Sequence, residues 1–341
     1  MRWSLREGEI VIEPRNRVTL SESDSDTSLR TETPIPGSVT VVVVSHNSAR
    51  HIPGLGRALA AGSLKPTRML MVDNSSVDNT VARARAAGFE VHETGSNNGF
   101  GAACNVALAM ADTEYVLICN PDVVPSSTAV EQLVSALTDV PAAAVAGAAY
   151  DQTFRARRFS RLSANVWSFL PGWMRSRLKR FAVEVTVDFH EKQVPVDYVV
   201  GAFMLCRVGA LRSVGGFDES FFLYSEEEDL CRRLGESGWQ TLFVSSVRLI
   251  HEHSTSSEGV NIAAMAPFRF HSLYWYYRKY HSRAYAELAR LMIAMCLLTH
   301  RAYRGLTKQC QVYGPGAVTA PFRSIDRIRR DHERRIAKRV A

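Results

Sequence analysis

Cysteine is scarce in this sequence, and its spacing follows no metal-binding or disulfide pattern. Six cysteines are spread over 341 residues, with no Cys-x-x-Cys pair and no cluster of cysteine with histidine. A structural zinc site and a dense disulfide framework are therefore not expected. This usage is typical of a reducing compartment, and we expect a cytoplasmic protein.

Long apolar runs and a targeting segment are also missing. The longest apolar run of the C-terminal helical pattern covers residues 291–298, well short of the roughly 20 residues that cross a bilayer. In the first 38 residues, Arg2, Arg6 and Glu7 interrupt any apolar stretch, so no signal peptide is predicted. A multi-span membrane protein is excluded.

Acidic residues are outnumbered by basic ones. The chain has 41 Lys and Arg against 34 Asp and Glu, a net charge of +7, within an otherwise ordinary globular composition. A basic excess fits a nucleic acid, a membrane surface or a phosphorylated substrate, but no nucleic-acid-binding motif accompanies it. Residues 152–181 carry eight basic and no acidic residues, and residues 322–341 carry a net +5, so the remainder of the chain is at −6.

Apolar, β-branched runs alternate with helical patterns between residues 39 and 119. Strands are predicted at 39–44, 67–72, 89–93 and 115–119, with helices at 50–61, 75–87 and 100–111. This alternation predicts an α/β fold with a parallel, doubly wound sheet, whose functional sites gather at the carboxyl ends of strands. Further strands are predicted at 196–200 and 241–244, with a helix-like stretch between the glycines at 201 and 215.

Polar clusters follow three of the predicted strands, at 45–47, 73–76 and 120–122. Asp73 could accept a hydrogen bond from a nucleotide base, or it could form an N-cap or an Asx turn. Asp122 could hold a divalent cation against a diphosphate, or the Asn-Pro-Asp sequence could make only a tight turn. The sequence alone leaves both alternatives open.

Four consecutive carboxylates, Glu226 to Asp229, follow the apolar run 221–224. An apolar wall and like-charged neighbours both raise the pKa of a carboxylate, which is how a general base is tuned. The alternative is a helix N-terminus, where the helix dipole favours acidic residues. Further along, His251 and His253 could include a metal ligand or could be ordinary loop histidines.

Six motifs occur in an order that is typical of one enzyme family: VTVVVVSHN, MVDNSSVDNT, NNGFGAACN, ICNPDV, VGAFMLCRVGALRSVGGFDESFFLYSEEEDLCRRL and IHEHSTSS. Over about residues 38–285 the sequence resembles an inverting family 2 glycosyltransferase, most of all the rhamnosyltransferase-type branch of bacterial cell-wall and polysaccharide synthesis. The resemblance implies the GT-A fold, a Rossmann-like, mostly parallel sheet flanked by helices, here with a C-terminal helical extension. It also implies dTDP-L-rhamnose as donor and a lipid-linked or polysaccharide acceptor, such as a polyprenyl-diphosphate-linked GlcNAc.

The resemblance assigns roles to the residues that match the family's motifs. Those assigned to the nucleotide sugar are Ser45, Asn47, Asp73, Asn97, Gly99, Asn105 and Asn120. Those assigned to the acceptor are Gly201, Ala202 and Asp229. Those assigned to a divalent metal, magnesium or manganese, are Asp122 and His251.

One motif departs from the family. The family's base is commonly the Asp of a Glu-Asp pair, and the matching pair here is Glu226-Glu227, so Glu227 is the predicted base and Glu226 the alternative. An extra methylene moves the carboxylate by about 1 Å, which matters for reaction geometry. The departure leaves open a non-catalytic protein that binds a nucleotide sugar or glycan. A transferase that uses a UDP- or GDP-sugar is a further alternative.

The chain divides into five predicted parts. They are a flexible N-terminal segment with room for a short docked strand (1–38), a nucleotide-sugar-binding half (39–150), a basic amphipathic insertion (151–195), an acceptor and catalytic half (196–267) and an aromatic-basic helical C-terminal region (268–341). The basic segments and the eight aromatic residues of 268–285 predict peripheral contact with the anionic inner face of the plasma membrane. An ordinary aromatic core is the alternative for 268–285, and a homodimer is left open.

Overall fold

The structure is a computed structural model that describes residues 2–6, 9–13, 35–148, 155–169, 172–178, 184–186, 192–251 and 262–306, together with 327 and 330. The chain forms two compact units, Met1–Thr33 and Pro34–Ala341. The first unit contains an antiparallel hairpin of β1 (Arg2–Arg6) and β2 (Glu9–Glu13). The predicted flexible stretch at 14–34, His253 and nearly all of the basic tail 322–341 lie outside the described residues.

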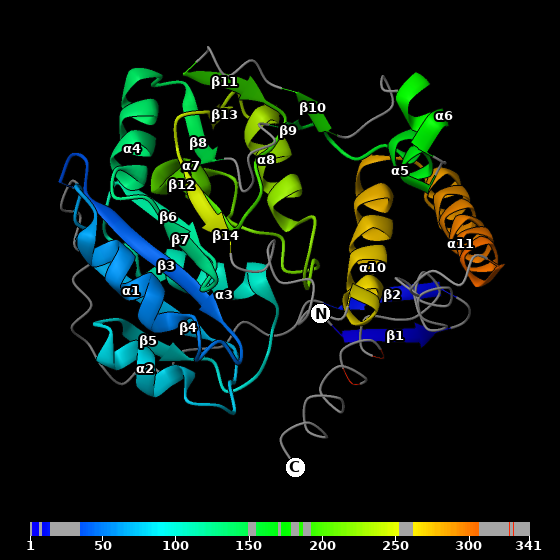
Figure 1. Cartoon of the computed structure of the whole chain (residues 1–341). Coiled ribbons are helices and arrows are strands. Elements are labelled where there is room, and N and C mark those ends of the chain that lie inside the picture. Colours follow the sequence, from blue (N-terminus) through cyan, green and yellow to red (C-terminus); the bar gives the residue numbers. More distant parts are fainter. Residues whose placement is uncertain are drawn as a thin grey trace. The chain divides into compact units, whose positions relative to one another are not determined.

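An eight-stranded sheet forms the centre of the second unit, in the order β11-β13-β8-β12-β6-β3-β4-β5 (Figure 1). Its strands are β3 (Val39–Ser45), β4 (Arg68–Asp73), β5 (Glu90–Glu93), β6 (Tyr115–Cys119), β8 (Ala143–Ala148), β11 (Gln193–Val196), β12 (Phe203–Arg207) and β13 (Gln240–Val244). The pairs within β6-β3-β4-β5 and the pair β13-β8 are parallel. β12 runs antiparallel to β6 and β8, and β11 runs antiparallel to β13. The predicted α/β fold with a mostly parallel sheet is confirmed.

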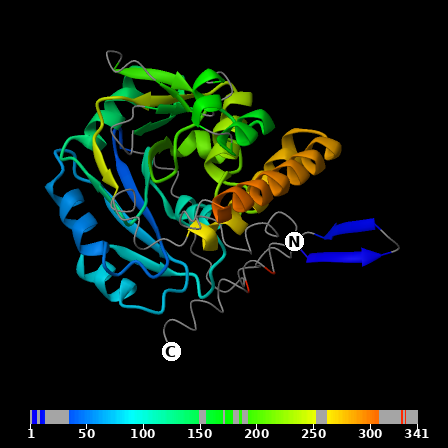
Figure 2. The same ribbon diagram turned by 45° about the vertical axis from the view of Figure 1, so that its right-hand side comes forward.

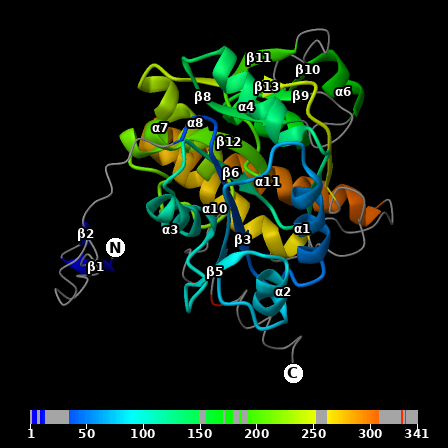
Figure 3. The ribbon, with the colours of Figure 1, turned by 90° about the vertical axis from the view of Figure 1, so that its left-hand side faces the viewer.

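Helices cover both faces of this sheet (Figure 3). Val39, Val41 and Val43 pack into one core together with α1 (Ile52–Ala61), α2 (Thr80–Ala86) and α4 (Ala129–Asp139). The alternate residues Val42 and Val44 pack into the opposite core, with α3 (Phe100–Met110), α7 (Val208–Ser213) and α8 (Glu226–Glu236). Because successive side chains of a strand point to opposite faces, the continuous valine run fills both cores at once.

Several elements differ from the prediction. β8 and β12 were not predicted as strands, and β12 takes the first part of the stretch that looked helical. The strand predicted at 196–200 lies instead at 193–196, as β11. The helix predicted from residue 75 begins at Thr80, because the preceding residues form a turn on Asp73.

In the described part of the second unit, two short sheets lie outside the central one. β7 (Val123–Pro125) pairs antiparallel with β14 (Leu249–His251), directly after the carboxyl end of β6. β9 (Arg155–Arg157) pairs antiparallel with β10 (Glu184–Thr186) within the predicted basic insertion. The first of these pairs joins two segments that are far apart in the sequence and that both carry predicted metal ligands.

The C-terminal helices form a third core (Figure 2). Here α10 (Ile262–Tyr280) and α11 (Arg283–Leu306) lie side by side and pack with α5 (Leu162–Phe169), which α6 (Gly172–Arg177) follows. Tyr276 and Tyr277 are fully buried in it, and the Tyr277 ring lies 5.3 Å from that of Tyr285. The segment 268–285 therefore supplies an ordinary aromatic core. In the described part of the chain, no helix combines the length and apolar character needed to cross a membrane.

Candidate functional site

The carboxyl ends of β3 and β4 meet through the side chain of Asp73. Its Oδ1 accepts hydrogen bonds from Ser45 Oγ at 2.8 Å and Ser76 Oγ at 2.6 Å, and its Oδ2 accepts one from Ser76 N–H at 2.8 Å. Ser45 and Asp73 are each only 1% exposed. The predicted carboxylate thus closes an Asx-type turn that fixes the edge of the site, while its contact with a nucleotide base stays a prediction.

Asn47 extends this polar network toward the next loop. It adopts a left-handed backbone with φ of 53°, donates its N–H to Ser76 Oγ at 2.8 Å, and accepts the Val77 N–H at 2.9 Å. The buried Asn74 donates from its amide to the carbonyl of Gly99 at 3.0 Å. We call Ser45, Asn47, Asp73, Asn74 and Ser76 the β3–β4 cluster.

Three predicted residues, Asn97, Gly99 and Asn105, shape the loop around the start of α3. Gly99 has φ of 97° and accepts no side chain, because a Cβ there would lie 2.4 Å from the Phe222 carbonyl oxygen. The Asn97 side chain accepts the Gly99 N–H at 3.1 Å. This close approach holds the segment before α8 against the start of α3.

Asn105 holds the same segment from within α3. Its amide donates to the Phe217 carbonyl at 2.9 Å and to Glu219 at 3.0 Å, and its oxygen accepts the Phe217 N–H at 2.8 Å. Asn105 therefore positions the loop that leads to the acidic run.

The end of β6 brings together residues predicted for the donor, the metal and the acceptor. Asn120 donates its N–H to the Ala202 carbonyl at 2.8 Å, which joins β6 to the start of β12. Asp122 is 6% exposed and immediately precedes β7, where Val123 is the partner of His251 on β14. The backbone register thus places the two predicted metal ligands, Asp122 and His251, at neighbouring positions.

The chain enters α8 through two residues with left-handed backbones, Tyr224 with φ of 71° and Ser225 with φ of 67°. Neither is glycine, and such geometry in non-glycine residues gathers at functional sites because the surroundings must impose it. This pair leads directly into the first turn of α8, where the acidic run lies.

Glu226 points back toward α3. A Cβ added to Gly101, on α3, would lie 3.7 Å from the Cβ of Glu226. Glu226 is only 5% exposed. Burial raises the pKa of Glu226 well above its usual value, and the charge of Glu227 raises it further. Its Oε2 has no hydrogen-bond partner among the described residues. This environment favours the neutral carboxylic acid.

Glu227 faces the strand ends instead. A Cβ on Gly201 would lie 3.5 Å from the Glu227 Cβ and 3.7 Å from the Phe100 ring. Gly201 directly precedes Ala202, the partner of Asn120. Glu227 is therefore the member of the acidic run that lies beside the predicted acceptor glycine and the carboxyl end of β6.

Glu228 and Asp229 point to two further neighbours. Glu228 accepts hydrogen bonds from Ser160 N–H and, at 2.9 Å, from Ser160 Oγ, and burial raises its pKa to about 7. Asp229 is fully buried and accepts from Arg233 Nε at 2.8 Å, Lys279 Nζ at 2.5 Å and Tyr280 Oη at 2.7 Å. The Asp229 carboxylate thus clamps α8 to α10, and its predicted contact with an acceptor stays untested.

The sequence signature of glycosyl transferase family 2 matches residues 40–215, just over half of the chain. The chain belongs to this family. It is 28% identical over 265 residues to the N-acetylglucosaminyl-diphospho-decaprenol L-rhamnosyltransferase of Mycobacterium tuberculosis (strain CDC 1551 / Oshkosh), a match that covers 71% of this chain and 84% of the relative. It is 26% identical over 232 residues to rhamnosyltransferase WbbL of Escherichia coli (strain K12), covering 62% of this chain and 83% of the relative.

A solved structure supports the fold of this family 2 glycosyltransferase. The mannosyltransferase PcManGT from Pyrobaculum calidifontis, in complex with GDP-Man and Mn2+, superposes with a TM-score of 0.53 at 16% identity. The match covers 82% of this chain and 79% of that structure. The GT-A fold implied by the sequence motifs is thereby confirmed.

The possible metal ligands of the transferase suit a divalent cation only when phosphate oxygens complete its coordination. The described residues include no group of three or more His, Cys, Asp or Glu side chains able to enclose a metal ion. One buried carboxylate, Asp122, and one neighbouring histidine position, His251, are present. Hard cations that bind nucleotide substrates commonly use few protein ligands and take the remainder from phosphate and water, so these residues fit magnesium or manganese held against a diphosphate.

Three contributors to the site were assigned no binding or catalytic role from the sequence. Asn74 and Ser76 lie inside a quoted motif, but only the structure shows that they carry much of the hydrogen bonding at the β3–β4 edge. Tyr224 lies just before the acidic run and is 37% exposed. Partial burial raises its pKa, the charge of Arg269 opposes this rise, and the charges of Glu226 and Glu227 add to it. Its position directly before the acidic run was the signal available.

Proposed function

We propose that the chain transfers a sugar from a nucleotide-sugar donor to a hydroxyl group in a single inverting displacement, with Glu227 as the base. The observation that carries this proposal is the divergence of the acidic run. Glu226 is buried toward α3, Glu228 is bound to Ser160 and Asp229 to α10, and Glu227 lies beside Gly201. Among the four carboxylates, Glu227 has the position that suits a base.

In the proposed reaction, Glu227 takes the proton of the acceptor hydroxyl as its oxygen bonds to the anomeric carbon. The bond from that carbon to the nucleoside diphosphate breaks at the same time, and one carboxylate base is sufficient. The β3–β4 cluster and Asn120 border the nucleotide, with Gly201 and Ala202 bordering the acceptor. Asp122 and His251 would hold a magnesium or manganese ion, whose charge would neutralise the departing diphosphate.

The names of the relatives favour a rhamnosyl donor and a lipid-linked acceptor. Two relatives that each match most of their own length are rhamnosyltransferases, and one of them is named for a diphospho-decaprenol substrate. We therefore propose dTDP-L-rhamnose as donor and a lipid-linked or polysaccharide acceptor of cell-envelope glycan synthesis.

A donor panel tests this function. dTDP-L-rhamnose, UDP-glucose and GDP-mannose would each be incubated with the chain and a GlcNAc-diphosphate lipid, and nucleoside diphosphate release would be measured with and without Mg2+ or Mn2+. We expect metal-dependent, acceptor-dependent release of dTDP, and a loss of about 10³-fold in Asp122→Asn. Release from none of the donors would contradict the proposal and favour a non-catalytic binding protein.

We also propose peripheral contact with an anionic membrane, made by α11 and not by the aromatic segment 268–285. α11 presents an apolar stripe at spacings of three, four and three residues: Leu288, Leu291, Met295 and Leu298, each between 52% and 57% exposed. The exposed Arg283 begins the same helix. An amphipathic helix with a cation at its start suits the headgroup region of the cytoplasmic leaflet.

Vesicle sedimentation tests the stripe. The variant Leu291→Ser/Met295→Ser should bind phosphatidylglycerol vesicles about tenfold more weakly than the parent, whereas Val77→Ser, which alters an exposed valine elsewhere, should not differ. Unchanged vesicle binding would contradict the membrane contact. If the double variant instead converts a dimer into a monomer, the stripe binds a second copy of the chain.

A further inference from the structure

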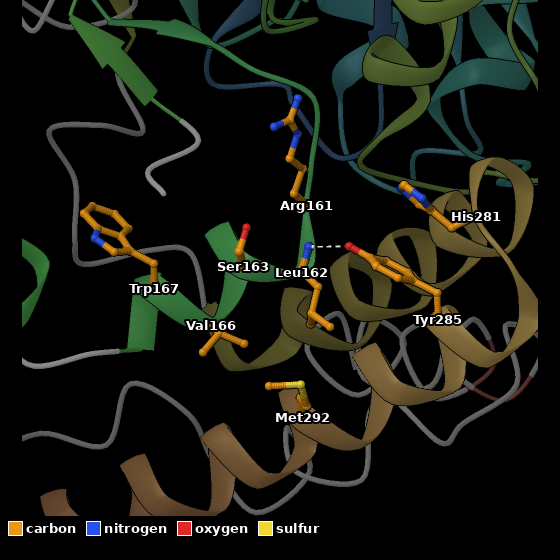
Figure 4. A pocket seen from close by; sticks show the side chains of 8 residues that line it. All are labelled: Arg161, Leu162, Ser163, Val166, Trp167, His281, Tyr285 and Met292. Carbon is orange, nitrogen blue, oxygen red and sulfur yellow. Dashed lines mark hydrogen bonds between the residues drawn. The ribbon is translucent and has the colours of Figure 1, made fainter. Parts of the chain in front are cut away.

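A pocket of about 590 Å³ lies between α5, α11 and the turn that joins α10 to α11 (Figure 4). This volume falls within the range of pockets that enclose small organic ligands. None of the residues assigned to the transfer reaction lines it. The pocket is thus a second concave site, separate from the strand ends that carry Glu227.

The lining of the pocket is predominantly apolar. Val166 and Trp167 of α5 and Met292 of α11 contribute to it, and Figure 4 shows Val166 and Met292 on the same side of the pocket. The Tyr285 hydroxyl accepts the Leu162 N–H at 2.9 Å. Its polar atom is therefore already bonded, and the Tyr285 ring remains available for apolar contact.

One end of the pocket is electropositive. Arg161 is exposed there, and its guanidinium has no ion-pair partner within the described ranges. His281 lies at the same end, and burial lowers its pKa, with the positive charges of Arg232 and Arg161 lowering it further. Arg232 itself pairs with Glu236 and stacks on Tyr280. An anion beside Arg161 would thus meet a positive field.

The positive end is connected to the catalytic helix. Ser160 directly precedes Arg161, and its N–H and Oγ both bind Glu228, the neighbour of Glu227 in the first turn of α8. On the other side, Leu288 and Met295 of the α11 stripe lie one helical turn from the pocket residues Tyr285 and Met292. The pocket residues thus adjoin the proposed membrane stripe along α11, and Arg161 adjoins the residue that binds Glu228.

The geometry points to a lipid diphosphate as the occupant, with its hydrocarbon chain among Val166, Trp167 and Met292 and its phosphate beside Arg161. This inference rests on the proposed transfer to a lipid-linked acceptor and locates the lipid end of that acceptor. A predominantly apolar pocket that is lined from α5 and α11 suits one hydrocarbon chain. The single cationic end matches the single anionic group of such a lipid.

Binding of farnesyl diphosphate to the full chain tests the inference. Isothermal titration would be run with the donor site filled by saturating dTDP and Mg2+, so that inorganic diphosphate and farnesyl diphosphate can be compared at the pocket alone. The parent should bind farnesyl diphosphate at least about tenfold more tightly than inorganic diphosphate, because the chain buries apolar surface. Val166→Trp should remove this difference by filling the pocket.

Further variants separate the two ends of the ligand. Ser163→Trp fills the pocket from an exposed position, so it serves if Val166→Trp does not fold, and Val77→Trp is the matched control. Arg161→Gln should weaken farnesyl diphosphate about tenfold and leave farnesol unaffected. Arg57→Gln, which removes an exposed charge on α1, should change neither ligand.

Three results would overturn the inference. They are equal binding by the parent and both tryptophan variants, a parent that binds farnesyl diphosphate no better than inorganic diphosphate, and complete displacement of farnesyl diphosphate by phosphatidylglycerol vesicles. Failure of the proposed function is distinguishable, because donor release would then be absent while farnesyl diphosphate binding still depended on Val166. In the converse case, sugar transfer would be active but farnesyl diphosphate binding would not depend on the pocket. That result would contradict the lipid site and leave the proposed function standing.

Discussion

The β3–β4 cluster and the first turn of α8 both concentrate polar side chains, but they arrange them in opposite ways. In the cluster, Asp73 is bonded to Ser45 and Ser76, so the side chains converge on one another. In the first turn of α8, successive residues are rotated by about 100°, so neighbouring carboxylates diverge to different partners. The polar side chains at the two strand ends therefore contact one another, whereas those in the first turn of the helix point to different parts of the molecule.

The largest loss of stability should come from replacing Asp229, the fully buried carboxylate of α8. Asp229→Asn removes the buried counter-ion of Arg233, while Lys279 keeps its pair with Asp218, and we expect a loss of about 3 kcal/mol in the free energy of unfolding, measured with urea. The control Glu236→Gln breaks an exposed pair with Arg232 and should cost less than about 0.5 kcal/mol. Unchanged stability with a raised KM for the acceptor would instead make Asp229 an acceptor ligand.

A second test uses the pH dependence of stability. Burial raises the pKa of Glu228 from 4.5 to about 7, so the folded chain holds this proton more tightly than the unfolded chain. The resulting stabilisation is fully present below pH 4.5 and is lost as the pH rises to 7, on the order of 3 kcal/mol in total. Urea unfolding between pH 4.5 and 7.5 should show this decline.

The matched variants for the pH test are Glu228→Gln and Glu90→Gln. Glu228→Gln removes the titrating group, so the decline between pH 5 and 7 should become shallower. Glu90 is an exposed carboxylate whose pKa is lowered by its hydrogen bond to Arg68, and Glu90→Gln should leave the slope in that window unchanged. A slope that is identical in all three proteins would refute the buried, bonded state of Glu228.

The smallest of these effects is expected in the β3–β4 cluster. Asp73→Asn weakens three hydrogen bonds to a charged acceptor, and we expect about 2 kcal/mol of destabilisation by thermal unfolding. Ser76→Ala should reproduce part of this loss, because it removes the 2.6 Å bond. If Asp73→Asn weakens dTDP binding while stability is unchanged, Asp73 contacts the nucleotide directly.

Much of the sheet could be predicted because local pattern determines it. Tyr115–Cys119 is an unbroken buried run, and β6 has the predicted bounds. β12 could not be predicted in the same way, because its insertion between β6 and β8 depends on pairing with distant residues. Ser75 misled the prediction of α2, since the turn on Asp73 gives it φ of 63° and delays the helix to Thr80.

The candidate site shows the same division. The clusters at 45–47, 73–76 and 120–122 were predicted from strand order. Ala202 and Glu227 were assigned from the family resemblance, and the structure shows Asn120 bonded to Ala202 and Glu227 beside Gly201. The choice between Glu226 and Glu227 was not available from the sequence. In the structure the two side chains leave α8 in different directions, Glu226 toward Gly101 and Glu227 toward Gly201, and the identity of the base stays a prediction.

The most direct measurement is the rate of sugar transfer by Glu227→Gln beside Glu226→Gln. Glu227→Gln should lower kcat by about 10²- to 10⁴-fold with unchanged affinity for the nucleotide, as expected for loss of a general base. Glu226→Gln replaces a buried carboxyl group, whose pKa is raised by burial, with its isostere and should stay within about threefold of the parent. Near-parental turnover in Glu227→Gln, or a collapse confined to Glu226→Gln, would contradict the assignment of the base.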